Sequence, residues 1–600
     1  MRFGKIIAPP LDRPLPPWMI FPVVFMALYA SHFTLLRLPY YWDEAGYYIP
    51  AAWDFFRTGS LIPITTLSNA HPPLPSIYLS LWWKICGFYP EVTREAVLMV
   101  AALALIAVWR LAMRLIGVVS VAFWTVLLTG LYPIWFAQSS LAQADIFAAA
   151  CSLWGLVYAL PGRGRKLWAA ALWFSAAALC KETAVSIPLT LAAVDIAEGI
   201  RHGAPARIPL STPRMKICPS TPASKDRPPG APVPWGLWRQ AAWLCACVLP
   251  LAAWYAYHYA KTGFLFGNRE FLRYNAQATL IPLRILAAFG HRILQLTAHM
   301  NLFVPVLMAL AALLLDPRPD AEGHDRAMLG PEALLRIFLL LLVNALLFSV
   351  LGGALLARYL LPMYPLVLLV AVSTFYRRVP YWQGLALLSA AAFLVALFLN
   401  PPYGFAPEDN LAYAHVVRMH QAGIARLTKL YPGATVLTAW PATDELTKPE
   451  LGYVKHPWEV CAIDDFTAAQ IDRAAQEPQE YSAALIFATK DEPAKPILNF
   501  GEALDERYFG LHHDLPPERI AGQLGGTLIW KRDDDGMWIA LLRFNRQIEA
   551  HLEQEDGERR AGRMGDYGGS PIPVESLDRA MWRFLKGKRY LTASVPLYTN

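Results

Sequence analysis

Two neighbouring carboxylates near the N-terminus are the first side chains of this sequence that could take part in a reaction. Asp43 and Glu44 stand among aromatic residues, in the stretch YYWDEAGYY of residues 40–48. A carboxylate can take the proton of a hydroxyl group as a general base. Adjacent side chains on a helix point about 100° apart, so we expect only one of the two to face a given site. The alternative is a helix cap at a membrane interface, anchored by Tyr and Trp.

Further along the chain, polar residues interrupt or border apolar stretches. His71 precedes a rigid Pro-Pro turn, where it could bind phosphate, orient a carboxylate or cap a helix. Asp145 lies where an apolar run begins; a helix N-terminus would stabilise its charge, although acids are common there in any case. Lys181 and Glu182 separate two apolar runs, either as part of a site or as an ion pair that marks a turn.

Three arginines complete the set of candidate residues. Arg269 and Arg273 would share one face of a helix, because four positions separate them. Paired guanidinium groups suit phosphate, which they bind by forked hydrogen bonds, but an exposed amphipathic helix explains the spacing equally well. Arg358 begins the stretch RYLLPMYP and either extends its charge to the membrane surface or points toward the acids.

Composition excludes several classes of protein. Apolar residues make up 56% of the 600 residues and charged residues only 16%, against about 25% charged residues in a typical soluble domain. A soluble globular enzyme, a disordered chain and a nucleic-acid-binding module are therefore excluded, and we expect no nucleic-acid partner. The net charge of +7 fits a membrane protein whose cytoplasmic loops are rich in Lys and Arg.

Long apolar runs predict an α-helical protein that crosses a membrane about eleven times, since a spanning helix needs about 17–25 such residues. The runs lie at residues 18–36, 96–114, 118–136, 141–160, 167–180, 184–196, 241–259, 302–315, 334–351, 359–375 and 382–399. Residues 1–399 form the predicted transmembrane domain. The first run has no cleavage site after it, so we interpret it as an uncleaved span with its N-terminus inside.

The runs at 167–180 and 184–196 are short and leave two interpretations, either two spans that turn at Lys181 or one long buried helix. Two spans place the basic loops, including residues 201–239 and the pair Arg377-Arg378, in the cytoplasm, as the positive-inside rule prefers. In this topology the acids, His71, Lys181 and the three arginines all lie on the outer face. Carboxylates and cations together on one membrane face suit a reaction between a membrane-anchored phosphate and a polar acceptor.

Residues 400–600 are more polar and predict a separate α/β domain outside the membrane. Helical patterns at 411–430 and 466–475 alternate with strand patterns at 434–440 and 482–488, and residues 526–542 read as a hairpin. We expect the acidic pairs Asp444-Glu445 and Asp464-Asp465 to lie on solvated faces or to cap helices. The tail after Ala550 has no predicted structure.

Several motifs of the chain occur together in one known superfamily. They are the Trp-Asp-Glu of residues 42–44, the His-Pro-Pro turn of residues 71–73, Asp145, Lys181 and the RYLLPMYP stretch of residues 358–365. In this combination the chain resembles the GT-C glycosyltransferases, in particular the protein O-mannosyltransferases (glycosyltransferase family 39) and the bacterial lipid A aminoarabinose transferases. The resemblance covers roughly residues 1–399.

The resemblance implies an inverting glycosyltransferase that moves a hexose or pentose from a polyprenyl-phosphate carrier to a lipid, glycan or protein. It also implies that the site lies on the extracytoplasmic side of the inner (plasma) membrane. Asp43 would be the general base or would orient the acceptor, Glu44 would support it, and Asp145 would arrange the site. Contacts with the phosphate or the lipid carrier would come from Lys181, Arg269, Arg273, Arg358 and Tyr359.

Some roles differ from the family pattern or stay open. His71, which we assign to substrate binding, stands where relatives often have Lys, so its exact role and the donor sugar stay open. The residues require no metal or other cofactor; a divalent metal, if one is bound, would be held by Asp43 and Asp145. Two other classes of function are kept: a secondary transporter, and a membrane-anchored binding protein that acts through its C-terminal domain.

Overall fold

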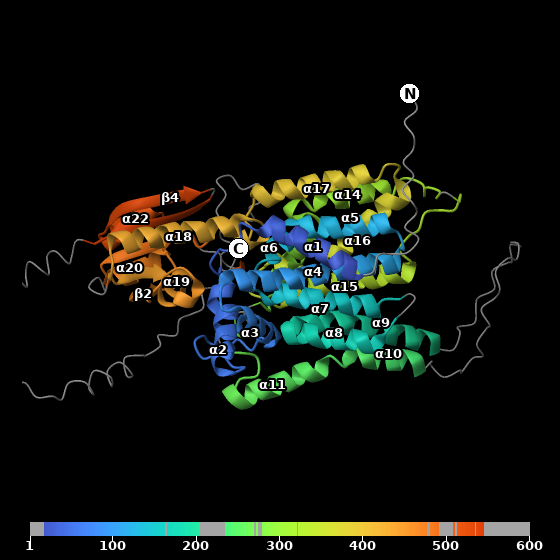
Figure 1. Cartoon of the computed structure of the whole chain (residues 1–600), viewed down its shortest axis with the longest axis horizontal. Coiled ribbons are helices and arrows are strands. Elements are labelled where there is room, and N and C mark those ends of the chain that lie inside the picture. Colours follow the sequence, from blue (N-terminus) through green and yellow to red (C-terminus); the bar gives the residue numbers. More distant parts are fainter. Residues whose placement is uncertain are drawn as a thin grey trace, which may run out of the picture.

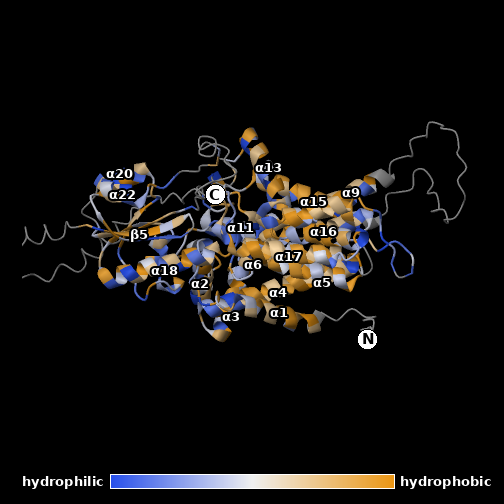
Figure 2. Ribbon diagram, turned by 90° about the horizontal axis from the view of Figure 1, so that it is seen from above, coloured by the Kyte–Doolittle hydropathy of each residue, from blue (hydrophilic) through white to orange (hydrophobic). Residues whose placement is uncertain are grey.

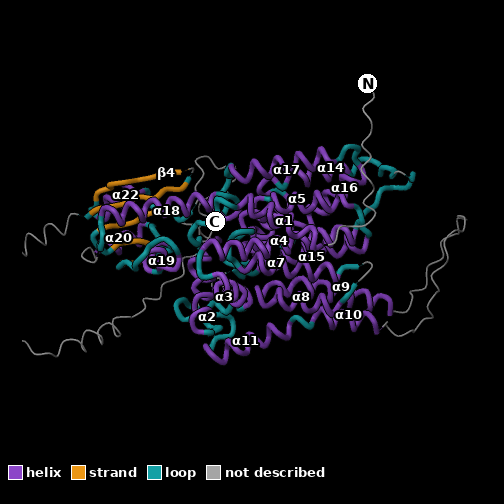
Figure 3. Tube along the Cα trace, viewed as in Figure 1, coloured by secondary structure: helices purple, strands orange, loops and turns teal. Residues whose placement is uncertain are grey.

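A helical bundle and a smaller unit with a β-sheet at one end of it make up the computed structural model (Figure 1). The structure describes residues 17–161, 165–203, 235–268, 272–273, 276, 279–320, 322–476, 481–490, 508–509, 513–534 and 536–544. The helices of the bundle run mainly along its length, and Figure 3 shows that the strands are confined to the smaller unit. The predicted membrane domain and C-terminal α/β fold therefore appear as different kinds of structure.

Each apolar run of the sequence falls on one or more helices of the bundle, which also contains helices outside the predicted runs, at residues 49–58, 74–86 and 282–297. These are α1 (Pro17–His32), α2 (Ile49–Thr58), α3 (Leu74–Cys86), α4 (Pro90–Leu115), α5 (Val119–Leu131), α6 (Pro133–Gln138), α7 (Ala144–Ala159), α8 (Leu167–Cys180), α9 (Ser186–Gly203), α10 (Trp235–Cys245), α11 (Val248–Thr262), α13 (Pro282–Thr297), α14 (Phe303–Ala312), α15 (Pro331–Val350), α16 (Tyr364–Arg378) and α17 (Gln383–Phe398). Short helical turns are η1 (Glu44–Tyr48), η2 (Glu182–Val185), η4 (His299–Asn301), η5 (Ala357–Leu360) and η6 (Pro407–Asp409).

Within the described part of the chain, four helices are long and apolar enough to cross a membrane, or five if a bent pair counts as one span. The other apolar helices of the bundle, such as α7 and α8, are shorter than 18 residues. The structure therefore contains the expected apolar helices, while the number of about eleven spans stays a prediction.

Small side chains allow the central helices to approach each other closely. α4 begins at Pro90 and buries alanines such as Ala101 and Ala104, and it packs against α1, α5 and α7. On α7, a Cβ atom at Gly155 would lie 2.4 Å from the Phe174 ring of α8. Only glycine permits this contact, which sets α8 tightly beside α7.

The chain reverses direction at Lys181, between α8 and α9. Arg165 just before α8 donates to Asp195 on α9 over 3.1 Å, although 30 positions separate them. A single straight helix would place these residues about 45 Å apart. The two helices are therefore antiparallel, as the interpretation of two spans requires, and one long helix is excluded.

The end of the bundle far from the sheet is held by a buried ion network, here called the distal network (Arg165, Asp195, Glu198, Glu332 and Arg336). Asp195 is fully buried and also accepts a hydrogen bond from Arg336 over 2.7 Å. The Arg336 guanidinium reaches Glu198 and Glu332, each over 3.1 Å. The network ties α8, α9 and α15 together at this end.

The C-terminal unit contains a five-stranded sheet with the strand order β2-β1-β3-β5-β4. Its strands are β1 (Val436–Ala439), β2 (Val460–Ile463), β3 (Ala483–Phe487), β4 (Thr527–Asp534) and β5 (Met537–Arg543), and its helices are α18 (Ala412–Leu430), α19 (Ala442–Thr447), α20 (Ala468–Gln476) and α22 (Pro517–Leu524). β1 pairs in parallel with β2 and β3, whereas β5 pairs antiparallel with β3 and β4. The predicted helices at 411–430 and 466–475 are present, as are the predicted strands and hairpin; β2, α19 and α22 were not expected.

The carboxyl end of β1 packs directly on the loop that contains Asp43. Trp440 follows β1 and meets Trp42 edge to face, with ring centroids 4.9 Å apart. A Cβ atom at Gly46 would lie 2.7 Å from the Trp440 ring, so glycine is needed for this approach. The hydroxyl group of Tyr453 donates to the Tyr40 carbonyl over 3.0 Å. The C-terminal unit therefore rests on the end of the bundle where the candidate residues lie, here called the site end.

Candidate active site

The structure separates the two neighbouring acids, as the helical geometry predicts. The Asp43 side chain is 30% exposed and forms an ion pair with Arg358. Glu44 is fully buried and faces Arg94, the residue that sequence reasoning missed because it borders an apolar run of α4. Asp43 can therefore reach a substrate, whereas Glu44 cannot.

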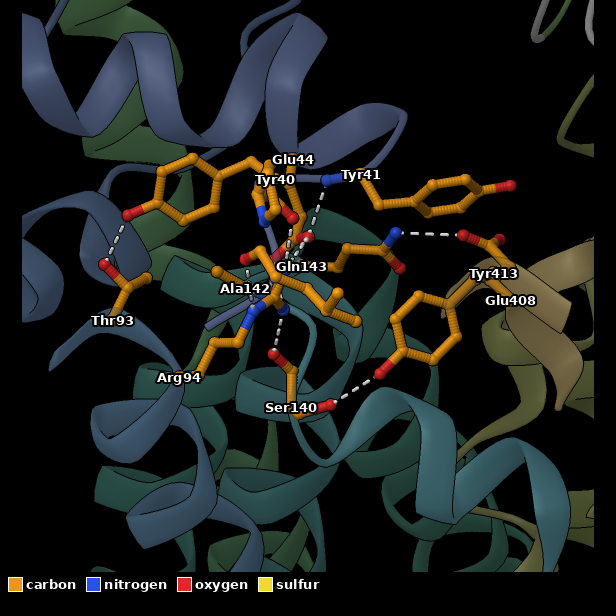
Figure 4. Close-up of polar contacts among 12 residues, drawn as sticks. Tyr40, Tyr41, Glu44, Thr93, Arg94, Ser140, Ala142, Gln143, Glu408 and Tyr413 are labelled. Atoms are coloured by element: carbon orange, nitrogen blue, oxygen red, sulfur yellow. Dashed lines mark hydrogen bonds and ion pairs between the residues drawn. The ribbon is translucent and has the colours of Figure 1, made fainter. Parts of the chain in front are cut away.

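Glu44 holds together the loops around Asp43, as Figure 4 shows. Its carboxylate accepts hydrogen bonds from the backbone N–H groups of Tyr41 over 2.9 Å and of Ala142 over 2.6 Å. Arg94 lies 3.4 Å from the same carboxylate and donates to the carbonyls of Pro39 and Ser140 over 2.7 and 2.6 Å. A buried charge pair with all these partners fixes the loop after α1 against the loop before α7.

Arg358 lies at the centre of a group here called the Arg358 cluster (Asp43, Asp145, Lys181, Arg358 and Glu408). Its guanidinium pairs with Asp43, lies 3.6 Å from Asp145 and 3.0 Å from Glu408. Lys181 approaches the other oxygen of Asp145 to 2.6 Å. Asp145, Lys181 and Arg358 come from separate outer loops of the predicted topology, and the structure brings them together with Asp43.

Tyr359 lies among cations of the site end. The Lys181 ammonium is 4.1 Å from the centroid of its ring, and the guanidinium carbons of Arg292 and Arg358 are 5.6 and 5.9 Å from it. An aromatic face attracts cations through its quadrupole. The ring therefore helps to hold together positive charges that would otherwise repel one another.

Glu408 is a member of the cluster that sequence reasoning missed. It lies in η6, just after the bundle, and also accepts a hydrogen bond from Gln143 over 2.9 Å. Burial raises the pKa of Glu408 to about 7, although the Arg358 guanidinium acts in the opposite direction. The acidic pair Glu408-Asp409 follows the last span as Asp43-Glu44 follows the first, and this similarity could have revealed it.

His71 and Glu182 form a second pair beside the cluster. Nδ1 of His71 lies 3.1 Å from the Glu182 carboxylate, and the imidazole stacks on Tyr48 with ring centroids 5.9 Å apart. His71, Tyr47 and Tyr48 line a hollow at this end of the bundle together with Pro72 and Pro73. Lys181 and Glu182 each have a different partner, so the interpretation of these neighbours as a pair with each other is wrong.

The remaining predicted residues do not join the cluster. Arg269 lies outside the described residues. Arg273 is described and exposed, and no contact joins it to the cluster in the described part of the chain. Their predicted arrangement on one helix face is therefore not tested.

A metal site at Asp43 and Asp145 stays a prediction. Both carboxylates already lie at the Arg358 guanidinium, so a divalent ion would compete with that cation for them. Among the described residues no group of three or more His, Cys, Asp or Glu side chains is arranged to hold a metal ion.

Comparisons with known proteins gave similarity only among solved structures. No protein-family model matches the chain, and no curated protein matches it. ArnT from Cupriavidus metallidurans bound to undecaprenyl phosphate is 14% identical, over 88% of this chain and 98% of that one, with a TM-score of 0.49. ArnT from the same organism in the apo state is 13% identical, over 87% of this chain and 97% of that one, with a TM-score of 0.46. This chain is thus similar to both structures along most of its length.

Proposed function

We propose that this protein is an integral membrane glycosyltransferase that moves a sugar, with inversion, from a polyprenyl-phosphate carrier to an extracytoplasmic acceptor. The observation that carries the proposal is the Arg358 cluster. It combines one accessible carboxylate, Asp43, with the buried cations Arg358 and Lys181. A transfer from a lipid phosphate needs both a group that accepts a proton and cations that stabilise a leaving phosphate.

In the proposed reaction, Asp43 accepts the proton of an acceptor hydroxyl group. The acceptor oxygen attacks the anomeric carbon from the face opposite the phosphate, and the bond from that carbon to the phosphate oxygen breaks. The electron pair leaves with the lipid phosphate, whose charge Arg358 and Lys181 stabilise. Asp145 holds Lys181 in place, and Glu44 supports Asp43 through the loop rather than by touching the substrate.

His71 and Tyr359 would contact the donor beside these cations. The hollow next to His71 is lined by tyrosines and prolines, a lining that suits the sugar or the first part of the carrier. We also assign Arg269 and Arg273 to carrier contacts, because both follow the apolar run of residues 241–259 in a stretch that the predicted topology places on the outer face. A divalent metal at Asp43 and Asp145 would stabilise the same leaving phosphate.

The proposed location is the inner (plasma) membrane, with the cluster and the C-terminal unit on the extracytoplasmic side. The opposite end of the bundle carries the basic residues Arg165, Arg326, Arg377 and Arg378. A cytoplasmic position of this end agrees with the positive-inside rule. The acceptor would be a lipid, a glycan or a protein of the cell envelope, and the sugar a hexose or pentose.

The test combines a deletion strain with one substitution. Mass spectrometry of the deletion strain should show a lipid-linked sugar that accumulates and an envelope component that lacks it. Asp43→Asn should lower transfer by about 10²–10⁴-fold, the usual contribution of a general base, with unchanged membrane insertion. The matched control is Asp325→Asn, because Asp325 pairs with Arg377 at the distal end and is 63% exposed. Full transfer by Asp43→Asn would refute the assignment.

Two measurements test the other classes of function. Counterflow of a solute in proteoliposomes without sugar transfer would establish a transporter. Full activity of a soluble fragment that starts near Asn400 would establish a binding protein that acts through the C-terminal unit.

A further inference from the structure

Helix α13 packs against α15 and presents two different faces. Together with η4 it is bent by 98° from α14, and Figure 2 shows it projecting from the bundle. Leu283, Leu286 and Ile293 are exposed on one face, by 55, 67 and 39%. Arg292 and Gln295 are buried on the opposite face, at 0 and 4% exposure.

The buried face of α13 binds the backbone that leads to Arg358. Arg292 donates to the carbonyls of Leu356 over 2.8 Å and of Phe348 over 3.2 Å. Gln295 donates to the Leu355 carbonyl over 2.6 Å and accepts from Arg292 over 2.7 Å. The two side chains therefore connect the end of α15 with the segment that precedes η5.

A second arginine, about two turns earlier on α13, extends this contact. Arg284 donates to the carbonyls of Gly352 and Gly353 over 3.2 and 2.8 Å. Gly352 has a φ of +99°, a conformation that side chains with a Cβ rarely adopt. A loop with adjacent glycines has much conformational freedom, so these hydrogen bonds determine its path.

Arg358 is only two positions beyond Leu356, and Arg292 also contacts the neighbouring Tyr359 ring. We propose that Arg292 and Gln295 are positioning residues for the transfer reaction: they fix the segment before η5 and thereby the Arg358 guanidinium between Asp43 and Glu408. The inference rests on the proposed function. It assigns a role to buried polar residues of a helix that touches none of the reacting groups.

A lysine at position 292 should weaken this arrangement without removing the charge. Arg292 bridges three carbonyl groups and Gln295 with a planar group, whereas an ammonium is a point charge on a flexible chain. A displacement of about 1 Å at a catalytic group can lower a rate about 10²-fold. We therefore expect Arg292→Lys to lower kcat by about 10- to 100-fold, and Gln295→Leu to lower it less.

The matched control is Arg326→Lys at the distal end. Arg326 donates to the carbonyls of Tyr376 and Val379 over 2.8 and 3.5 Å and lies 5.3 Å from the Tyr376 ring. It thus combines carbonyl and aromatic contacts as Arg292 does, but far from the Arg358 cluster. Arg326→Lys should leave kcat unchanged, and both variants should be checked for equal expression and unfolding temperature.

A double-mutant cycle on the full-length protein distinguishes positioning from general damage. If Arg292 acts through Arg358, Arg292→Lys combined with Arg358→Lys should be no slower than Arg358→Lys alone. If the double variant loses kcat by the product of the two single losses, the inference is overturned. If Arg358→Lys leaves no measurable transfer, the pH profile of Arg292→Lys decides instead.

The pH profile reports the contact between the cation and its carboxylates. Asp43, Asp145 and Glu408 face Arg358 from three elements, and Lys181 adds a further positive charge. Of these carboxylates, Glu408 has its pKa lowered by Arg358, so a displaced guanidinium makes protonation of Glu408 easier and the acid limb of kcat should move to higher pH. If the acid limb of the pH profile stays at the same pH while kcat itself is lower, the inference is refuted. If transfer survives both Asp43→Asn and Arg358→Lys, the roles assigned to these residues fail, whereas an absence of sugar transfer by the natural protein would refute the proposed function itself.

Discussion

The effect of replacing Glu408 by glutamine on the unfolding free energy should become more favourable to the variant as the pH rises from 5 to 8. The pKa of Glu408 is raised by burial from its ordinary value of 4.5 to about 7. Between these values the folded protein keeps a proton that the unfolded chain gives up. The stability that this carboxyl group contributes is therefore complete below 4.5 and is lost as the pH rises through 7.

The magnitude follows from the two pKa values. At about 1.4 kcal/mol per pH unit, raising the pKa from 4.5 to about 7 costs about 3 kcal/mol once the pH exceeds 7. Glutamine never ionises, and its amide oxygen can still accept the hydrogen bonds from Gln143 and Arg358. The difference in unfolding free energy between the variant and the natural chain should therefore grow by about 2–3 kcal/mol from pH 5 to pH 8.

Reversible unfolding with SDS in mixed micelles, followed by tryptophan fluorescence, measures this difference at each pH. The matched control is Glu332→Gln, because Glu332 also pairs with an arginine, Arg336, but its side chain is 53% exposed. Solvent screens that pair, so its variant should show little dependence on pH. A difference for Glu408→Gln that stays constant or shrinks as the pH rises would refute the reasoning.

Two further substitutions test how the loop of Asp43 is held. Glu44→Gln should lower the unfolding free energy by about 3–5 kcal/mol, because it removes one partner of a fully buried ion pair. The control is Glu91→Gln, because the Glu91 side chain is 42% exposed and pairs with the exposed Arg37. Equal unfolding free energies of the two variants would contradict this role of Glu44. Gly46→Ala places a Cβ atom 2.7 Å from the Trp440 ring, so the C-terminal unit must shift. Limited proteolysis should cut that unit faster and transfer should fall, whereas Gly384→Ala, which meets nothing within 4 Å, should behave as the natural chain does.

Local patterns were sufficient for the helices on the apolar runs and for most strands. Every apolar run became helical because a segment of such length and composition can satisfy its backbone hydrogen bonds internally. The hairpin of β4 and β5 follows from alternation and an Asp-Gly turn. β2 was missed because its residues VCAI stand between Glu459 and the pair Asp464-Asp465, whereas β1 lies within the longer apolar run ATVLTAW.

The members of the site with distant partners were beyond sequence reasoning. Glu408 lies 50 positions from Arg358, and the structure alone brings them together. Glu445 was expected on a solvated face or as a helix cap, which is wrong: it is buried and lies 2.7 Å from Nδ1 of His420 on α18. A charged residue that pairs across the fold has the same local sequence as a solvated one, so only the tertiary structure distinguishes them.

The distal network bears on how a substrate can pass through the bundle. A transporter protein that opens alternately to the two sides of the membrane must separate its helices at each end in turn. To part α8, α9 and α15 at the distal end, Asp195 would lose Arg165 and Arg336 while still enclosed by protein. Breaking a buried ion pair in this way costs about 3–5 kcal/mol. Buried ion pairs thus hold the distal end closed, whereas the site end has a hollow beside His71. This asymmetry suits a reaction at one end of the bundle.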